Sequence, residues 1–130
     1  MTFSHPLQTR FRDADALGHV NNAVIVTYFE VARYAWWQAY LGGRPFAEEG
    51  FLIARLEVDY RKPILVGDGV RVEVRCSRIG TTSFDLACRI LGEDGTPFAE
   101  GRTVQVMMAP GLGSPAPIRP GTRAWLETQA

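Results

Sequence analysis

The spacing of apolar and polar residues changes along the chain, and it predicts one long helix followed by strands. Residues 23–41 contain neither Gly nor Pro and show no period-2 alternation, and their apolar side chains spread around most of a helix circumference. Asn21 and Asn22 can cap the start of this helix, and Gly42 and Gly43 can end it. A helix that is apolar on so many sides needs to be wrapped by other elements.

Period-2 alternation predicts the strands. They are expected at Leu52–Arg61, Val70–Ser77, Phe84–Ile90 and Phe98–Met108, with a first strand at Phe3–Arg12 before the helix. In the last strand, Val104 and Val106 are expected to point inward, which requires a bulge near Gly101. The pattern therefore predicts an α+β fold, in which an antiparallel sheet of about five strands curls around the helix. Its other face, rich in Arg and Glu, would meet solvent or a partner subunit.

The length of 130 residues fits one domain, which we assign to residues 1–109. Residues 110–130 hold four of the eight prolines and show no periodicity. We expect them to form a Pro/Gly-rich tail packed on or near the surface, with a helical turn at Thr122–Thr128 that holds Trp125 and Leu126.

Charge and composition narrow the classes of partner. Fourteen basic residues balance fourteen acidic ones, so the chain has no net field that would attract nucleic acid or an anionic membrane. No apolar run is long enough to span a membrane, and the first residues do not resemble a secretory signal, so a cytoplasmic protein is expected. Cys76 and Cys88 have no CxxC spacing and lie on apolar faces, which favours buried free thiols over a metal or redox site. We expect no metal and no cofactor.

Candidate chemistry concentrates in residues 10–33, at the junction between the first strand and the helix. Free amides at a helix start can polarise a carbonyl group, and a nearby carboxylate such as Asp15 can act as base or nucleophile. The combination predicts an acyl-transfer site. Asp13 and Asp15 could equally be turn residues, His19 a loop histidine, and Asn22 an ordinary cap residue.

The runs DADALGHVNN and TYFEVAR resemble the signature of hotdog-fold acyl-CoA thioesterases of the 4-hydroxybenzoyl-CoA thioesterase type. Later segments are similar as well: VDYRKPILVGD from Val58, TSF from Thr82 and EGRTV from Glu100. The resemblance covers about residues 5–108, and it implies a hotdog fold, in agreement with the sheet and helix derived above.

The resemblance assigns a role to each residue of the junction. It implies that Asp15 is the catalytic carboxylate, that Gly18 is the turn glycine and that an amide near Asn22 or Ala23 is the oxyanion donor. His19 also matches a functional His of plant acyl-carrier-protein thioesterases, although Leu17 stands where those enzymes have Asn.

Four further residues are candidates for substrate binding. Ile25 stands where many relatives carry a Tyr that lines the acyl pocket, so an aromatic acyl group is not assumed. Ser83 could contact the thioester or water, or could simply be a strand-edge hydroxyl. Arg61 and Lys62, at a strand end, could bind CoA phosphates or could be a solvated pair.

Together these features predict a thioesterase that hydrolyses acyl-CoA to free acid and CoA, with Asp15 as general base or nucleophile. The resemblance implies a homodimer at least, which can pair further into a homotetramer. A non-hydrolytic acyl-CoA or acyl-carrier binding module is an alternative, and a hotdog hydratase or dehydratase is another. In the last case the acidic residue would be Glu30, although Glu30 is expected to pair with Arg33 at i+3.

Overall fold

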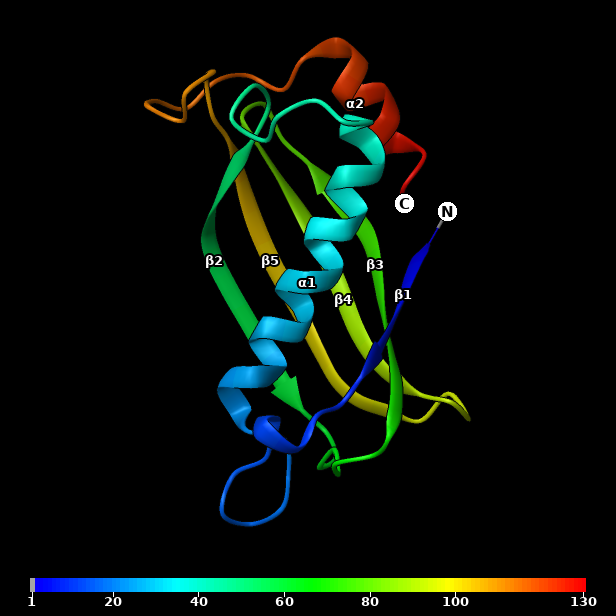
Figure 1. Ribbon diagram of the computed structural model, residues 1–130. Helices are drawn as coiled ribbons and strands as arrows, with labels where there is room; N and C mark the ends of the chain where they lie inside the picture. The colour runs from blue at the N-terminus through cyan, green and yellow to red at the C-terminus, as the bar shows by residue number, and fades with distance from the viewer. Residues whose placement is uncertain (1) are drawn as a thin grey trace.

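The computed structural model describes residues 2–130 and confirms the α+β architecture (Figure 1). The strands are β1 (Phe3–Gln8), β2 (Phe51–Tyr60), β3 (Gly69–Ile79), β4 (Ser83–Gly92) and β5 (Pro97–Met107). The helices are α1 (Asn22–Leu41) and α2 (Pro120–Glu127), and a 3-10 turn, η1, spans Phe11–Asp13. All strands form one antiparallel sheet in the order β1-β3-β4-β5-β2.

Helix α1 begins and ends at the cap residues that the sequence predicts. The Asn21 side chain accepts a hydrogen bond from the Ala23 amide at 2.8 Å, which satisfies one of the free donors of the first turn. At the other end, Gly42 adopts a left-handed conformation with φ of 61°, which favours glycine. The caps therefore fix where α1 starts relative to the preceding loop.

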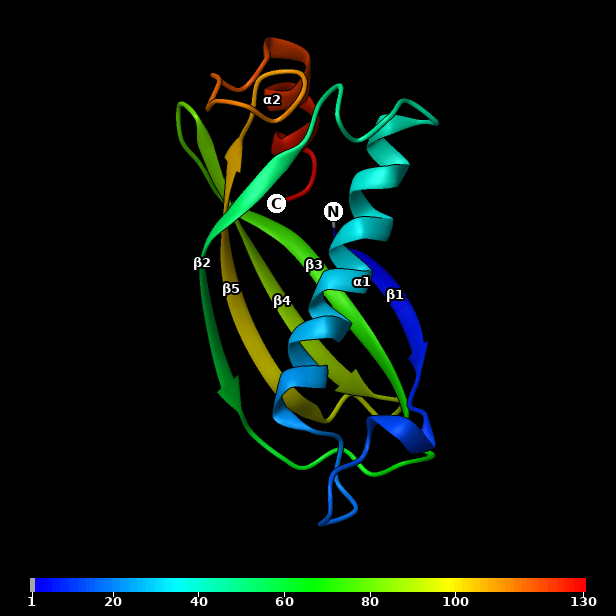
Figure 2. The ribbon, with the colours of Figure 1, turned by 60° about the vertical axis from the view of Figure 1, so that its left-hand side comes forward.

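The core lies between α1 and the concave side of the sheet, which curls around the helix (Figure 2). From α1, the fully buried side chains Phe29, Ala32 and Trp36 face this core. From the sheet, the alternating residues of β3 and β4 face it: Val72, Val74, Phe84, Leu86, Cys88 and Ile90. Burial of this apolar surface is the main stabilising contribution to the fold.

The predicted inward face of β5 is wrong. Thr103 and Gln105 pair with Leu86 and Phe84 and are buried on the concave side, whereas Val104 and Val106 point outward. These two polar side chains are tolerated inside because they hydrogen bond to each other. The pattern of apolar residues alone therefore predicted the wrong side of β5 to face the core.

The bulge expected near Gly101 lies elsewhere. Pairing of β5 with β2 and β4 is continuous at Gly101, whereas β5 is irregular at Phe98, between the paired residues Pro97 and Ala99, and β2 is irregular between Ile53 and Arg55. Gly101 instead permits close packing, because a Cβ at this position would lie 2.8 Å from Cε2 of Phe29. The need for a small residue beside Phe29, and not a backbone irregularity, therefore explains why position 101 is a glycine.

Residues 110–130 contribute to the core. Helix α2 replaces the expected helical turn, and its Leu126 is completely buried. The Trp125 ring packs against Trp36, with 4.8 Å between ring centroids, and against Tyr40, at 4.6 Å. The Cys76 amide donates to the Gln129 carbonyl at 2.7 Å. The tail thus closes the end of the sheet near the C-terminus of α1 (Figure 1).

Strand β2, expected to be half-buried, is mostly exposed in the single chain. It is an edge strand that pairs only with β5, and Leu52, Leu56 and Tyr60 are each at least two-fifths exposed. Helix α1 has an uncovered side as well, formed by Val31 and Tyr34. An unpaired edge next to exposed apolar side chains is typical of a surface that another chain covers.

Candidate active site

The loop between η1 and α1 carries the candidate catalytic residues at one end of the molecule (Figure 1). Its two ends are joined by a bridge between Ala14 and Val20 and by a hydrogen bond from the Asn21 amide to the Asp13 carbonyl at 2.9 Å. Gly18 has φ of 79°, which favours glycine and turns the chain back toward the helix. The loop is therefore a tight hairpin held against the start of α1.

Asp15 lies within this hairpin and is partly exposed. Its backbone amide donates to the His19 carbonyl at 2.8 Å, and its Oδ1 accepts from the Leu17 amide at 2.9 Å. No ion pair of Asp15 is present within residues 2–130. One carboxylate oxygen is thus held by the turn, while the other is free to contact a ligand.

The first turn of α1 leaves one amide without an acceptor. The Ala23 amide donates to Asn21 Oδ1 and the Val24 amide donates to the Asn21 carbonyl, whereas no acceptor for the Asn22 amide lies in the described part of the chain. Of the two oxyanion donors expected, Ala23 is therefore already occupied in this structure. The Asn22 carbonyl is also fixed, because it accepts from the Tyr60 hydroxyl at 3.1 Å.

His19 lies on the same hairpin as Asp15, and its backbone forms a bridge with Leu65. Its imidazole is partly exposed and makes no hydrogen bond within residues 2–130. The neighbouring Val20 amide donates to the Ile64 carbonyl at 2.8 Å, so two backbone contacts join this side of the hairpin to the segment after β2. His19 is brought close to Asp15 along the hairpin, without a side-chain contact between them.

The structure separates the two aspartates that the sequence could not distinguish. Asp13 is only 4% exposed, accepts a hydrogen bond from the Tyr28 hydroxyl at 2.6 Å and accepts another from the Arg10 amide at 3.0 Å. Burial alone would raise the pKa of Asp13, but these hydrogen bonds outweigh it and lower the pKa. Burial and the Asp13 carboxylate raise the pKa of Tyr28. Asp13 is therefore an anchor for the hairpin, whereas the carboxylate of Asp15 is more exposed and makes no ion pair in the described chain.

Tyr28 was missed as a site residue, although its place on the helix is a usable signal. It lies in the second turn of α1, on the side that faces η1 and β1. An open groove of about 500 Å³ runs here between β1, η1 and α1. We call it the Asp13 groove; it is lined by Leu7, Gln8, Arg10, Arg12, Asp13, Val24, Thr27, Tyr28 and Val31. Asp15 is not among its lining residues.

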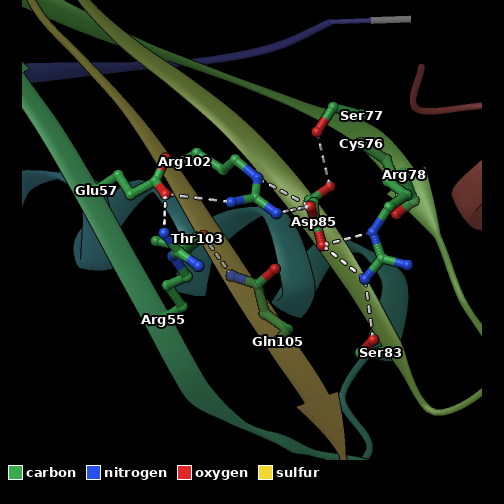
Figure 3. Close-up of polar contacts among 10 residues, drawn as sticks. All are labelled: Arg55, Glu57, Cys76, Ser77, Arg78, Ser83, Asp85, Arg102, Thr103 and Gln105. Atoms are coloured by element: carbon green, nitrogen blue, oxygen red, sulfur yellow. Dashed lines mark hydrogen bonds and ion pairs between the residues drawn. The ribbon is translucent and has the colours of Figure 1, made fainter.

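Two predicted substrate-binding residues lie elsewhere in the chain. Ile25 is 3% exposed and belongs to the core, so it does not line an open acyl pocket in the single chain. Ser83 begins β4 at the opposite end of the sheet from the hairpin and accepts a hydrogen bond from Arg78 Nη2 at 3.1 Å (Figure 3). Within one chain, neither residue is brought together with Asp15.

Arg61 and Lys62 differ in whether their charged groups already have carboxylate partners. The Arg61 guanidinium pairs with Glu100 at 3.2 Å and lies 3.8 Å from Asp59. The Lys62 ammonium lies over the Phe98 ring, 5.8 Å from its centroid. A phosphate would compete with two carboxylates for Arg61, whereas Lys62 has no carboxylate partner in the described chain.

The two cysteines are buried free thiols, as expected. Burial raises the pKa of Cys88 to about 12 and also raises the pKa of Cys76, so neither thiol is activated as a nucleophile. No group of three His, Cys, Asp or Glu side chains within residues 2–130 could hold a metal ion. The described helices include none that is both long and apolar enough to cross a membrane.

A family description, the thioesterase-like superfamily, matches residues 9–126. The chain belongs to the thioesterase-like superfamily. Because this match covers most of the chain, it includes the hairpin, α1, the sheet and α2. The hotdog fold expected from the sequence is confirmed by the sheet order and by solved structures of similar fold.

Two solved structures show how far the similarity of this superfamily member extends. A thioesterase from Thermus thermophilus, in complex with coenzyme A and Zn, is 37% identical, with a TM-score of 0.80 and coverage of 95% of both chains. A predicted thioesterase from Bacillus stearothermophilus is 29% identical, with a TM-score of 0.89 and coverage of 100% of this chain and 97% of the other.

A curated relative extends the comparison without adding a function. The uncharacterized protein YsmA of Bacillus subtilis (strain 168) is 26% identical over 110 residues, which is 83% of this chain and 74% of YsmA. The names of the solved relatives agree on thioester hydrolysis as the activity of the family.

The convex face of the superfamily fold carries a charged network centred on Asp85 (Figure 3). Asp85 is 2% exposed, and its carboxylate is bound by Arg102 Nη2 at 2.6 Å and by Arg78 Nη2 at 3.0 Å. Arg102 also contacts Glu57, at 3.4 Å. Burial alone would raise the pKa of Asp85, but the hydrogen bonds and charges of both arginines outweigh it and lower the pKa.

Replacing Asp85 with Asn is therefore expected to destabilise the fold in a pH-dependent way. At pH 7 the free energy of unfolding should fall by about 1–3 kcal/mol, because charge-assisted hydrogen bonds are lost. A carboxylate with a lowered folded-state pKa stabilises above its unfolded pKa, so the difference between the two proteins should shrink as the pH falls below about 4. Urea unfolding at pH 7 and at pH 3 measures the loss of unfolding free energy and its dependence on pH.

The control is Glu57→Gln, at an exposed member of the network. Equal stability of Asp85→Asn and the parent protein at pH 7 would contradict a stabilising role of Asp85.

Proposed function

We propose that this protein hydrolyses an acyl-CoA thioester to a free acid and CoA. The observation that carries the proposal is the hairpin, which holds a carboxylate free of ion pairs, Asp15, beside a helix start whose Asn22 amide has no acceptor within residues 2–130. The CoA in the complex of the Thermus thermophilus relative supports CoA as the carrier. Because hydrolysis uses this chain's own carboxylate and amide, the proposal requires no metal or redox cofactor.

The chemical roles follow from the types of group. The Asn22 amide and the positive end of the α1 dipole would stabilise the negative charge that develops on the thioester oxygen. Asp15 would act as general base for water or as nucleophile at the same carbonyl. His19 and Gly18 support this arrangement: Gly18 provides the left-handed turn and His19 fixes Asp15 through its carbonyl. The resemblance to the 4-hydroxybenzoyl-CoA thioesterase type concerns this hairpin, and the buried Ile25 argues against assuming an aromatic acyl group.

Substrate binding would extend over two further regions. Lys62, with no carboxylate partner in the described chain, is the better candidate than Arg61 for a CoA phosphate. Ser83 would reach a thioester only if a second subunit brought it there, because it lies at the far end of its own sheet. The cytoplasmic location expected from the sequence stays a prediction.

We propose a homodimer as the working assembly. One chain exposes apolar surface in three places: the uncovered side of α1, the edge strand β2, and the region of η1 and the hairpin. In this last region, Phe11 is 88% exposed and Leu17 is 79% exposed. Pairing through an open edge strand would bury much of it, and further pairing through the convex face would give a tetramer. In such a dimer, the exposed hairpin of one subunit could meet residues of the other.

The test is a panel of acyl-CoA thioesters of different chain lengths, assayed with a thiol-detecting reagent. We expect release of free CoA from at least one member. Binding of acyl-CoA without release would instead identify a non-hydrolytic binding module, and interconversion of enoyl and hydroxyacyl groups would identify a hydratase. Either result would overturn the proposed hydrolysis.

A further inference from the structure

A second hollow lies beside α1, between this helix, the segment before β2 and the start of β2. Its volume is about 430 Å³, which is within the range of small-molecule sites. We call it the Arg33 hollow; it is lined by Glu30, Val31, Arg33, Tyr34, Trp37, Phe46, Phe51 and Ile53. Most of these side chains are apolar or aromatic, which favours a hydrocarbon ligand. Val31, Tyr34 and the β2 residues belong to the surface that the proposed homodimer would cover, so the hollow would lie at that interface.

Arg33 is the unusual member of this lining. It is only 7% exposed, and its guanidinium has no hydrogen bond or ion pair with any residue of the described chain. The expected i+3 ion pair with Glu30 is not formed, although the exposed Glu30 lines the same hollow. Burial accordingly lowers the pKa of Arg33.

A mostly buried guanidinium without a carboxylate partner is costly. No fully buried side-chain nitrogen of the described chain lacks a partner, so the unpaired nitrogens of Arg33 remain accessible, and an anion in the hollow could bind them. The planar guanidinium fork matches a carboxylate, to which it can donate two parallel hydrogen bonds. Because the rest of the hollow is mostly apolar, the anion that fits best is one at the end of a hydrocarbon chain.

We propose that the Arg33 hollow binds the far end of the acyl chain and that this end carries a carboxylate. The substrate class would then be CoA monothioesters of dicarboxylic acids. This inference rests on the proposed thioester hydrolysis and adds the identity of the acyl group to it.

The position of Arg33 on α1 sets the length of the acyl chain. Arg33 follows Asn22 by eleven residues, which is about 16 Å along a helix. Helical side chains lean toward the N-terminus, which shortens the gap. Val31 lines both the Arg33 hollow and the Asp13 groove, so the two hollows border the same residue of α1. An acyl chain of medium length could therefore connect the hairpin with Arg33, whereas a short one such as succinyl could not.

The experiment compares octanoyl-CoA with the CoA monothioester of octanedioic acid, which differs in its terminal carboxylate. We expect the parent protein to have the higher kcat/KM for the dicarboxylic substrate, by about 10-fold or more, which corresponds to one charge-assisted hydrogen-bonded pair. Arg33→Met should remove this preference while octanoyl-CoA is still hydrolysed. Equal kcat/KM values for the two substrates in the parent protein, or an equal loss on both in Arg33→Met, would overturn the inference.

Two further variants keep the test valid if Arg33→Met does not fold. Glu30→Gln, at the exposed rim of the hollow, removes a negative charge near the ligand and should raise the preference for the dicarboxylic substrate by about twofold. Arg75→Met, at an exposed position of β3 on the convex face, should leave the preference unchanged. An unchanged or lower preference in Glu30→Gln would count against a carboxylate in this hollow.

Binding of free acids separates this inference from the proposed function. Titration calorimetry should detect octanedioic acid but not octanoic acid, and Arg33→Met should abolish the difference. If this holds while no acyl-CoA is hydrolysed, the proposed function fails and the anion site stands. If Arg33→Met instead converts a dimer to monomers in sedimentation, the guanidinium pairs with a second copy of the chain, and the inference is wrong.

Discussion

Asp15→Asn is expected to reduce thioester hydrolysis by at least about 100-fold, because loss of a group that acts on the reacting carbonyl typically costs this much or more. The fold should be retained. The Asp15 side chain accepts one hydrogen bond in the chain, from the Leu17 amide at 2.9 Å, and the oxygen of Asn can accept the same bond. The measurement is kcat on the best acyl-CoA of the panel, with circular dichroism and sedimentation to verify the fold and assembly.

Asp59→Asn is the matched control for this substitution. Asp59 is an exposed carboxylate on β2; its side chain lies 3.8 Å from Arg61 and makes no hydrogen bond with the hairpin within residues 2–130. We expect its kcat to equal that of the parent protein. Full activity of Asp15→Asn would reject Asp15 as the catalytic carboxylate and leave the buried Asp13 as the only other acidic group of the junction.

Removal of residues 119–130 is expected to prevent stable folding. Leu126 is completely buried, and replacing such a leucine with Ala alone costs about 2–5 kcal/mol. The deletion also removes Trp125 from its contacts with Trp36 and Tyr40, and the Gln129 side chain, which accepts from the Trp36 indole at 3.1 Å. Since domains of this size are stable by about 5–15 kcal/mol, the combined loss should exceed what the rest can supply.

Urea unfolding followed by Trp fluorescence measures this effect, with Leu126→Ala as a milder variant in case the deletion protein is insoluble. Glu127→Ala is the control, because Glu127 lies on the same helix and is exposed; its effect should stay within about 0.5 kcal/mol. A truncated protein with unchanged stability would show that residues 1–118 fold without α2, in agreement with a domain that ends at residue 109.

Local sequence patterns predict the helices and strands of the fold well, but they predict less accurately which residues pack against one another. The cap residues Asn21 and Gly42 and the apolar run between them predict α1 because they act within a few residues of sequence. The phase of β5 was predicted wrongly because Thr103 and Gln105 are polar, and only their mutual hydrogen bond makes burial acceptable. Such pairing depends on geometry across a strand, which a hydrophobic pattern does not contain.

The candidate site shows the same division. The DADALGHVNN run predicts a turn glycine and a cap residue before a helix, and the structure confirms that Gly18 turns the chain and that Asn21 caps the helix. The sequence does not distinguish Asp13 from Asp15, because both are acidic residues two positions apart. The difference comes from the Tyr28 hydroxyl, which reaches Asp13 from the second turn of α1, whereas the Asp15 side chain accepts only from the Leu17 amide in the described chain.

The sequence by itself determined the α+β architecture, the boundaries of α1 and the buried state of both cysteines. These properties depend on residues close together in the chain, on their periodicity and on their caps. Only the tertiary structure decided which side of β5 is buried, that the tail completes the core and that Arg33 is buried without a carboxylate partner in the described chain. Each of these depends on contacts between residues far apart in sequence, whose free energy is set by burial and pairing and not by residue type alone.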